Sequence, residues 1–333
     1  MRNRIIAIIL VVCAFSMVLL TGCNTQKKDE EKTKLTVLAL KGPTGIGLSG
    51  LWEKSENGKT HNDYSITLTS DTSEVSAAAI AGNYDIIAMP VNLASVVKNR
   101  GAEYSFLAVN TLGVLYVVEN GNSINSLEDL KGKTIYTTGQ GATPEYIINY
   151  VLKSNNIDPE KDLKLEFVAD TSEISSKLAA GTIDVAIIPE PFVTSTKLAS
   201  KTGNYRVALN MTQEWDKISS TPLVQGVVVV KTKLLKENPL AVGKFLFDYR
   251  ESVNYVNNNV EEASKTVAKY GIVPSDKVAL NAIPNCNIVC VNGENGVKYM
   301  KGMLSVLFEA NPKSIGGKMP SEDFFAVVNV EEK

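Results

Sequence analysis

The sequence predicts an α/β fold: two mostly parallel sheets flanked by helices and joined by two chain crossings. Short apolar runs alternate with stretches of helical spacing, which is the order expected of parallel strands covered by helices. The alternation occurs twice, over about residues 35–115 and 120–220, before a helical tail. About 300 residues follow the polar N-terminal segment, more than one typical domain holds, so we expect two lobes.

The expected strands are apolar or alternating runs bounded by turn residues, and prolines 90 and 189 stop two of them. These strands are Leu35–Leu40, Tyr64–Ser70, Asp85–Met89, Phe106–Asn110, Leu112–Val118, Thr134–Thr138, Leu163–Ala169, Val185–Ile188, Tyr205–Leu209 and Val224–Val230. The expected helices follow cap residues such as Asp71 or an early proline such as Pro144. They are Val75–Ala81, Asn92–Arg100, Tyr146–Leu152, Ser172–Ala180, Pro239–Val256, Val260–Tyr270, Lys277–Ile283 and Val297–Phe308.

Two long apolar runs, Leu112–Val118 and Gln225–Val230, lie at the two ends of the second α/β segment. We infer that they carry the chain between the lobes, an arrangement that permits hinge closure over a cleft. The helical tail then returns to the first lobe. We therefore predict one domain from residues 35–116 with 224–333, and a second from 117–223.

The N-terminus combines positive charge, an apolar run and a cysteine. Two arginines precede the uncharged run Ile5–Leu20, which has 16 residues. A membrane-spanning helix needs about 20 apolar residues, so the run is short for a span and typical of a secretory signal. It ends in Leu-Thr-Gly-Cys, which resembles the bacterial lipobox, whose cysteine receives diacylglycerol before cleavage. We predict a signal peptide over 1–22 and a lipidated Cys23; the alternative is an uncleaved signal anchor with an incidental cysteine.

Residues 23–34 are polar and charged. Such a composition cannot pack a core, so we predict a lipid anchor followed by a flexible tether. Two acyl chains hold a protein stably on a membrane. The expected location is the outer face of the cytoplasmic membrane, at the cell surface or in a periplasm.

Composition excludes several classes of function. The formal charge is −2 and becomes −4 without the two signal-peptide arginines. No basic block follows Lys27-Lys28, so nucleic acid is not an expected partner. His61 is the only histidine and lies in a polar stretch, which argues against hydrolases and metalloenzymes that use histidine as base or ligand. The motifs Gly-x-Ser-x-Gly, the phosphate-binding P-loop and His-Glu-x-x-His are missing from the sequence.

Only Cys286 and Cys290 remain after the signal and the anchor. In a strand their Cα atoms would lie about 13 Å apart, too far for a disulfide. We interpret both as small core residues. The sequence therefore predicts no catalytic residue, no cofactor and no metal.

Several local patterns together resemble a known family. Ala81–Ile87 and Ala180–Ala186 share a glycine followed by an apolar residue and an aspartate at the step from helix to strand. Ser126–Lys133 precedes a strand, Pro189–Phe192 follows one, and Gln225-Gly226 opens the return strand. Over about residues 33–325 the chain resembles the type II periplasmic-binding-protein fold, in the branch serving nitrate, taurine, aliphatic sulfonate and thiamine-pyrimidine-precursor importers. The resemblance implies a monomeric solute-binding protein that captures a small molecule and delivers it to the permease subunits of an ABC importer.

Ligands of open α/β sheets bind beyond the carboxyl ends of the strands. The candidate ligand-binding residues follow four such ends: Gly42, Thr44, Gly45, Asn92, Gln140, Gly141, Thr143 and Glu190. Glycine loops that open helices bring backbone N–H groups close to a ligand, although each loop could also be a plain turn. Asn92 could be only a helix cap, and Glu190 only an exposed acid.

The identity of the ligand stays open between two classes. Helix N-termini favour a sulfonate-type anion. Glu190, and the scarcity of arginine at the strand ends, favour a pyrimidine-like heterocycle that carries N–H donors. Two other functions remain: a same-fold enzyme of pyrimidine or menaquinone precursor metabolism, or a surface sensor lipoprotein that binds a protein partner.

Overall fold

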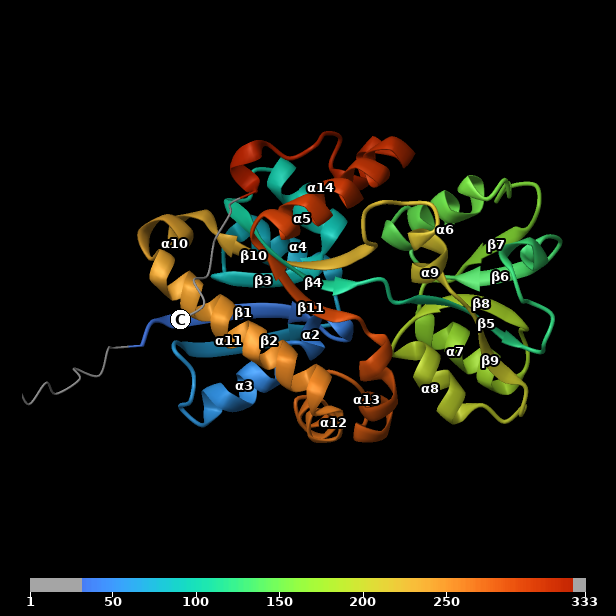
Figure 1. The fold of residues 1–333 in the computed structure, drawn as a ribbon, viewed down its shortest axis with the longest axis horizontal. Coiled ribbons are helices and arrows are strands. Elements are labelled where there is room, and N and C mark those ends of the chain that lie inside the picture. The colour runs from blue at the N-terminus through green and yellow to red at the C-terminus, as the bar shows by residue number, and fades with distance from the viewer. Residues whose placement is uncertain (1–31, 326–333) are drawn as a thin grey trace, which may run out of the picture. The chain divides into compact units, whose positions relative to one another are not determined.

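The computed structural model describes residues 32–325, and the chain from Lys34 onward forms one compact unit. The predicted signal peptide and Cys23 lie outside the described residues. Two sheets form, and helices cover them (Figure 1). The strands are β1 (Lys34–Leu40), β2 (Asp63–Thr69), β3 (Ile86–Pro90), β4 (Tyr104–Leu112), β5 (Leu115–Asn120), β6 (Thr134–Thr137), β7 (Lys164–Phe167), β8 (Val185–Pro189), β9 (Tyr205–Asn210), β10 (Val224–Lys231) and β11 (Ile288–Asn292).

The first sheet has the order β11-β4-β10-β3-β1-β2. Strand β1 pairs in parallel with β2 and β3, while β10 lies antiparallel between β3 and β4. The second sheet has the order β7-β6-β8-β5-β9, in which β6 pairs in parallel with β7 and β8, and β5 runs antiparallel between β8 and β9. In each sheet four strands run in one direction, which confirms the predicted pair of mostly parallel sheets.

Helices flank both sheets. They are α2 (Pro43–Ile46), α3 (Ser49–Glu56), α4 (Thr72–Ala81), α5 (Val91–Asn99), α6 (Thr143–Ser154), α7 (Thr171–Ala180), α8 (Phe192–Ala199), α9 (Met211–Asp216), α10 (Thr232–Glu237), α11 (Pro239–Asn258), α12 (Val260–Lys269), α13 (Asp276–Ala282) and α14 (Gly293–Ala310). Asp71 and Asp170 accept hydrogen bonds from the amides two residues on and so cap α4 and α7. Left-handed glycines 82 and 181 end the same two helices.

The chain crosses between the sheets twice. The first crossing is Gly113–Val114, because the predicted strand Leu112–Val118 breaks there into the end of β4 and the start of β5. A Cβ on Gly113 would lie only 2.1 Å from the Thr212 hydroxyl oxygen, so no side chain fits at this point. The second crossing is Lys217–Leu223, ahead of the predicted Gln225–Val230. That valine run is instead the interior strand β10, since β3 and β4 pair with it on both sides.

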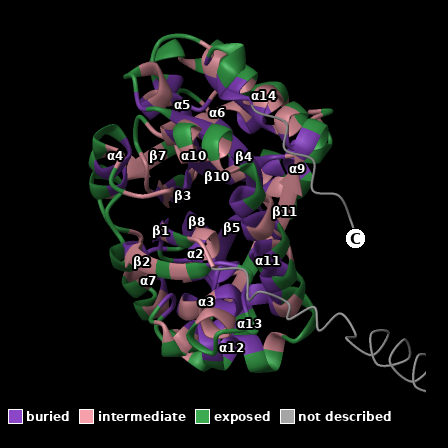
Figure 2. Cartoon of the chain, turned by 90° about the vertical axis from the view of Figure 1, so that its left-hand side faces the viewer, coloured by how far each residue is buried: buried purple, intermediate pink, exposed green. Residues whose placement is uncertain are grey.

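Strand β11 and helices α3, α8, α9 and α10 were not predicted. Strand β11 is short, half-buried and bulged against β4, so its sequence lacks a clear period. Buried residues concentrate on the strands of both sheets and on the helix faces turned toward them, while exposed residues lie on the outer helices (Figure 2). Burial of these aliphatic faces stabilises both sheets, at about 25 cal/mol for each Å² of apolar surface.

The cysteine prediction is confirmed in part: Cys286 is buried, Cys290 is half-buried, and neither is in a disulfide. Within residues 32–325, no group of three histidine, cysteine or acidic side chains could hold a metal. No helix in that part of the chain is long and apolar enough to cross a membrane.

Candidate functional site

The loop after β1 meets the loop after β8, so two predicted parts of the site come together. Gly42 is buried with φ +84°, and a Cβ built on it would lie 3.8 Å from Cδ of Pro191. The Glu190–Pro191 peptide bond is cis. Near this point α8 packs against α13, and the Tyr116 hydroxyl donates to the Asn285 carbonyl at 3.0 Å. The two sheets therefore contact each other at the carboxyl ends of β1 and β8.

Glu190 lies at this contact and is only 2% exposed, so the alternative interpretation of an exposed acid is wrong. Its oxygens accept hydrogen bonds from the Thr194 amide at 3.1 Å and the Thr194 hydroxyl at 2.9 Å, in the first turn of α8. Burial raises the pKa of Glu190 to about 7, although these bonds and the charge of Lys197 oppose the shift. Each carboxylate oxygen has a further lone pair, so Glu190 can accept another donor.

The loop after β1 uses most of its own backbone donors. The Gly42 amide donates to the Ile272 carbonyl at 3.2 Å, and the amides of Gly45 and Ile46 donate to the Gly42 carbonyl. A Cβ on Gly45 would lie 2.6 Å from the Leu40 carbonyl oxygen, so Gly45 is needed for packing. The half-buried Thr44 hydroxyl makes no hydrogen bond within residues 32–325. The Thr44 hydroxyl is therefore the group of this loop that could form a hydrogen bond with a ligand.

The loop after β6 leads into α6. Gln140 and Gly141 are exposed, and the Gly141 amide donates to a Glu145 carboxylate oxygen at 2.5 Å. This carboxylate occupies the place where an anionic ligand would approach the helix start. Thr143 is 4% exposed, and its hydroxyl is buried without a hydrogen-bond partner. An unpaired buried hydroxyl is unfavourable by about 1–3 kcal/mol, so this group is available to a ligand or an ordered water.

Asn92 follows β3 and contacts the C-terminal part of the chain. Its amide donates to the Ser314 carbonyl at 3.4 Å and does not cap α5, whose N-cap is Pro90. Nearby, the Asn311 amide donates to the Tyr146 hydroxyl of α6 at 3.0 Å, and α6 packs against α14. The predicted residues thus form two groups, Gly42–Gly45 with Glu190, and Gln140–Thr143, while Asn92 contacts Ser314.

Three residues near these groups were not predicted as site residues. Tyr116 and Cys286 are buried close enough to Glu190 for its charge to raise the pKa of both, in addition to the larger effect of burial. Asn110 is 1% exposed, and its amide donates to the Thr44 carbonyl at 3.4 Å. Asn110 is a polar residue in the otherwise mostly apolar strand β4, and this position in the sequence could have marked it as a candidate site residue. Nothing in the sequence placed the Cys286 thiol beside a carboxyl group.

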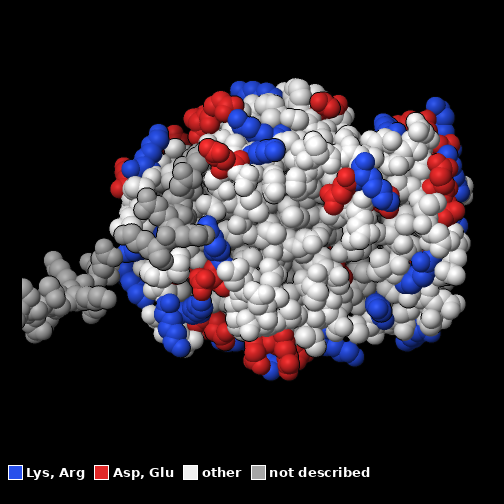
Figure 3. All heavy atoms as spheres, in the orientation of Figure 1, with Lys and Arg blue, Asp and Glu red and all other residues white. Residues whose placement is uncertain are grey.

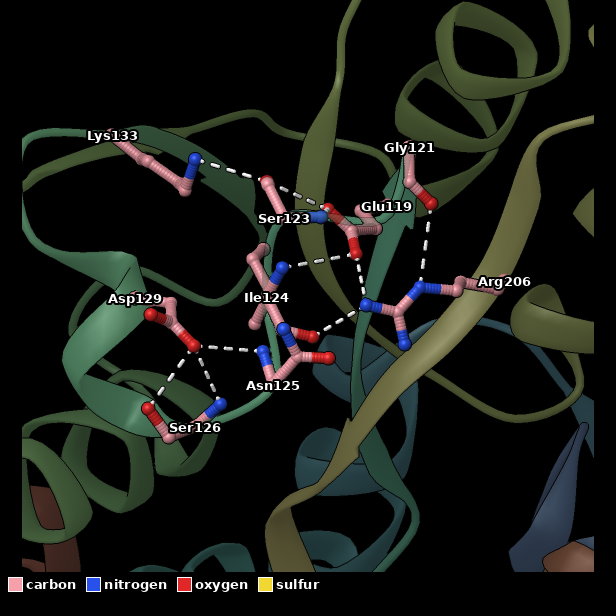
Figure 4. Close-up of polar contacts among 9 residues, drawn as sticks. All are labelled: Glu119, Gly121, Ser123, Ile124, Asn125, Ser126, Asp129, Lys133 and Arg206. Carbon is pink, nitrogen blue, oxygen red and sulfur yellow. Dashed lines mark hydrogen bonds and ion pairs between the residues drawn. The ribbon is translucent and has the colours of Figure 1, made fainter.

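No arginine reaches either group among the residues that the structure describes. The Arg206 guanidinium donates to Glu119 and to the carbonyls of Gly121 and Ile124 (Figure 4). Arg250 donates to Asn292, and Arg100 ends α5. The face seen in Figure 3 likewise carries charged side chains mainly around its edge, with a broad uncharged centre. The arrangement offers hydroxyls and a buried carboxyl for binding.

A family model matches residues 57–279, and its description is ABC transporter, phosphonate, periplasmic substrate-binding protein. A curated relative, the Bacillus subtilis binding protein YtlA, is 23% identical over 256 residues, which cover 74% of this chain and 73% of YtlA.

Solved structures share the fold. An ABC transporter protein from Parabacteroides distasonis superposes with a TM-score of 0.75 at 20% identity, over 89% of this chain and 99% of that one. The Escherichia coli aliphatic sulphonate binding protein SsuA superposes with a TM-score of 0.70 at 15% identity, over 91% and 95%. Because the family model spans most of the two sheets and these folds agree, the chain belongs to the family of periplasmic substrate-binding proteins of ABC transporters.

Proposed function

We propose that the chain captures a small molecule between its two sheets and delivers it to the permease of an ABC importer, without chemical conversion. The domains would be residues 35–116 with 224–333, and 117–223. The strand content of the two sheets supports the boundary at 223/224, while β5 of the second sheet begins at Leu115, two residues before the other boundary. The site offers no histidine, since His61 lies beside Asp248 on α11.

The ligand that fits best carries N–H donors, as an amino-substituted pyrimidine-like heterocycle does. The observation that carries this proposal is Glu190, a buried carboxyl that, in the part of the chain described by the structure, accepts hydrogen bonds from Thr194 alone and has no arginine among its partners. A donor from the ligand would restore the solvation that burial removes from this carboxyl. An anion beside Glu190 would instead meet like charge.

A sulfonate-type anion is the second candidate. The unpartnered Thr143 hydroxyl at the start of the twelve-residue helix α6 favours it. Glu145 opposes it, because that carboxylate already accepts the Gly141 amide. The name of the similar protein SsuA agrees with this candidate.

Thermal-shift and calorimetric titration with pyrimidines, thiamine, sulfonates, taurine, nitrate and phosphonates would test the proposal. Ligand at about 100 times its dissociation constant adds about 2.7 kcal/mol of stability, which raises the melting temperature by several degrees. We expect a heterocycle that carries an amino group to raise the melting temperature of the protein. The substitution Glu190→Gln should weaken the binding of that ligand by about 1–3 kcal/mol. Glu166→Gln, a surface control, should bind normally. Unchanged affinity in Glu190→Gln would remove Glu190 from the site, and a shift with an anion alone would favour the second candidate.

We also propose that Cys23 carries the lipid and that the mature chain lies on the outer face of the cytoplasmic membrane. The lipobox and the short apolar run support this. Mass spectrometry of the mature N-terminus should find a diacylglyceryl cysteine. A mature chain that starts elsewhere would contradict the anchor.

A further inference from the structure

One end of the first sheet exposes apolar side chains and lysines, although the protein has a net charge of −2. Strands β1 and β2 begin there side by side, with Lys34 opposite Asp63. The loop before β2 reaches α11, because the Asn62 amide donates to the Ala241 carbonyl at 3.0 Å. The start of β1, helix α10 and the first turns of α11 lie on the same side of the first sheet (Figure 1). We call this surface the entry face.

The entry face exposes two large apolar side chains on one stripe of α11. Leu240 is 60% exposed and Phe247 is 42% exposed. Their seven-residue spacing puts them on one side of the helix, with Lys244 between them. The His61 ring lies edge-on to Phe247, with centroids 5.1 Å apart, and is itself held by Asp248. The two side chains therefore lie on one stripe of α11, and the Phe247 end of that stripe packs against the His61 ring.

Lysines border this stripe. Between residues 232 and 247 three lysines accompany one acid: Lys233, Lys236 and Lys244 against Glu237. Lys34 at the start of β1 is exposed, as is Lys59 in the loop before β2. A face with exposed leucine and phenylalanine among lysines matches the surface of a membrane that contains anionic lipids.

The chain itself limits how far this face can lie from a membrane. Ten residues, 24–33, separate Cys23 from Lys34, and ten residues span at most about 35 Å when extended. As a flexible chain they span about 17 Å on average. We propose that the entry face rests on an anionic lipid surface while the protein is anchored. This proposal rests on the proposed lipid anchor at Cys23 and goes beyond ligand capture.

The test uses the full mature lipoprotein in vesicles of phosphatidylcholine, with and without phosphatidylglycerol. Hydrogen exchange should slow in peptides covering 57–63 and 236–250, more strongly on the anionic vesicles. The double substitution Leu240→Ser with Phe247→Ser should remove that protection. The fraction of molecules whose entry face is detached from the lipid should rise on the order of tenfold, since two apolar side chains no longer enter the lipid.

The matched control is Leu198→Ser with Leu280→Ser, which changes two exposed leucines on α8 and α13 and should leave the protection intact. Equal exchange on both vesicle types, or protection that survives the entry-face substitutions, would overturn the proposal. Flotation with the vesicles reports the anchor separately. Protein that does not float overturns the anchor and with it this proposal, whereas floating protein without protection overturns only the entry face. Neither result bears on ligand capture.

Discussion

Two buried glutamates at opposite ends of one strand pair show how differently this fold treats the same side chain. Glu119 lies near the end of β5, and Glu190 follows β8, which pairs with β5 in antiparallel register. They are 1% and 2% exposed. Glu119 accepts hydrogen bonds from the amides of Ser123 and Ile124, from the Ser123 hydroxyl, and from Arg206 (Figure 4). Among residues 32–325, Glu190 accepts hydrogen bonds only from Thr194.

The pKa values of the two carboxyls consequently move in opposite directions. Burial alone would raise the pKa of Glu119, but the hydrogen bonds from Ile124 and Ser123 and the charge of Arg206 together lower it. Burial of Glu190 is not offset to the same degree, and its pKa rises to about 7. Glu119 is thus a satisfied structural group, whereas Glu190 lacks partners that a ligand could supply.

The largest expected effect is on the structural member of the pair. Glu119→Gln would leave the partly buried Arg206 guanidinium without its carboxylate. Breaking such a pair lowers the free energy of unfolding by about 3–5 kcal/mol. Denaturant titration at neutral pH measures this loss. Glu173→Gln, which breaks an exposed pair with Lys177, should change stability by less than about 0.5 kcal/mol. Equal losses in the two variants would contradict the structural role.

The next effect is the pH dependence that Glu190 gives to the unliganded protein. Its folded pKa, about 7, lies above the ordinary value of 4.5, so the folded chain holds a proton that the unfolded chain has released between these values. Stability should therefore fall as pH rises from about 4.5 to about 7, by about 3 kcal/mol in total.

Glu190→Gln has no such titration, so it should gain stability over the wild type through that window and match it at the acid end. Unfolding curves of both proteins across the window measure this difference. A constant difference would mean that Glu190 is ionised throughout and that the contrast with Glu119 is false. Glu119 should behave in the opposite way, because its lowered pKa makes its contribution disappear only as pH falls below about 4.5.

The smallest effect concerns the partner of Glu190. Thr194→Val keeps the backbone donor but removes the hydroxyl bond, which is worth about 1 kcal/mol. The pKa of Glu190 should rise above its present value of about 7, because the ionised form loses a donor. Carbon-13 NMR titration of the labelled carboxyl would measure it. Thr196→Val, whose hydroxyl donates to the Phe192 carbonyl instead, should leave that pKa unchanged.

The sequence was sufficient to predict helices and strands with a strong hydrophobic period. It was insufficient to predict burial and strand pairing that depend on residues far apart in the chain. The two sheets and the cap at Asp71 follow from local patterns. The burial of Glu190 does not, because Cys286 and Tyr116 reach it from other parts of the chain. The Gly141 amide was expected to be open to a ligand, yet Glu145, one turn later, accepts it. The valine run was predicted as a strand, but its place in the sheet interior as β10 depends on pairing with β3 and β4, which a local pattern cannot show.

The two crossings between the sheets differ in length and contain none of the proposed ligand-binding residues. Gly113–Val114 supplies four soft torsions, and close contact with Thr212 allows no side chain at Gly113. The other crossing has seven residues, Lys217–Leu223. Its larger number of backbone torsions allows it to adapt to the relative orientation of the two sheets that the short crossing permits. Neither crossing contains Thr44, Thr143 or Glu190. The loops could therefore be redesigned for a new cargo while the link is kept, which makes this chain a suitable frame for a fluorescent sensor.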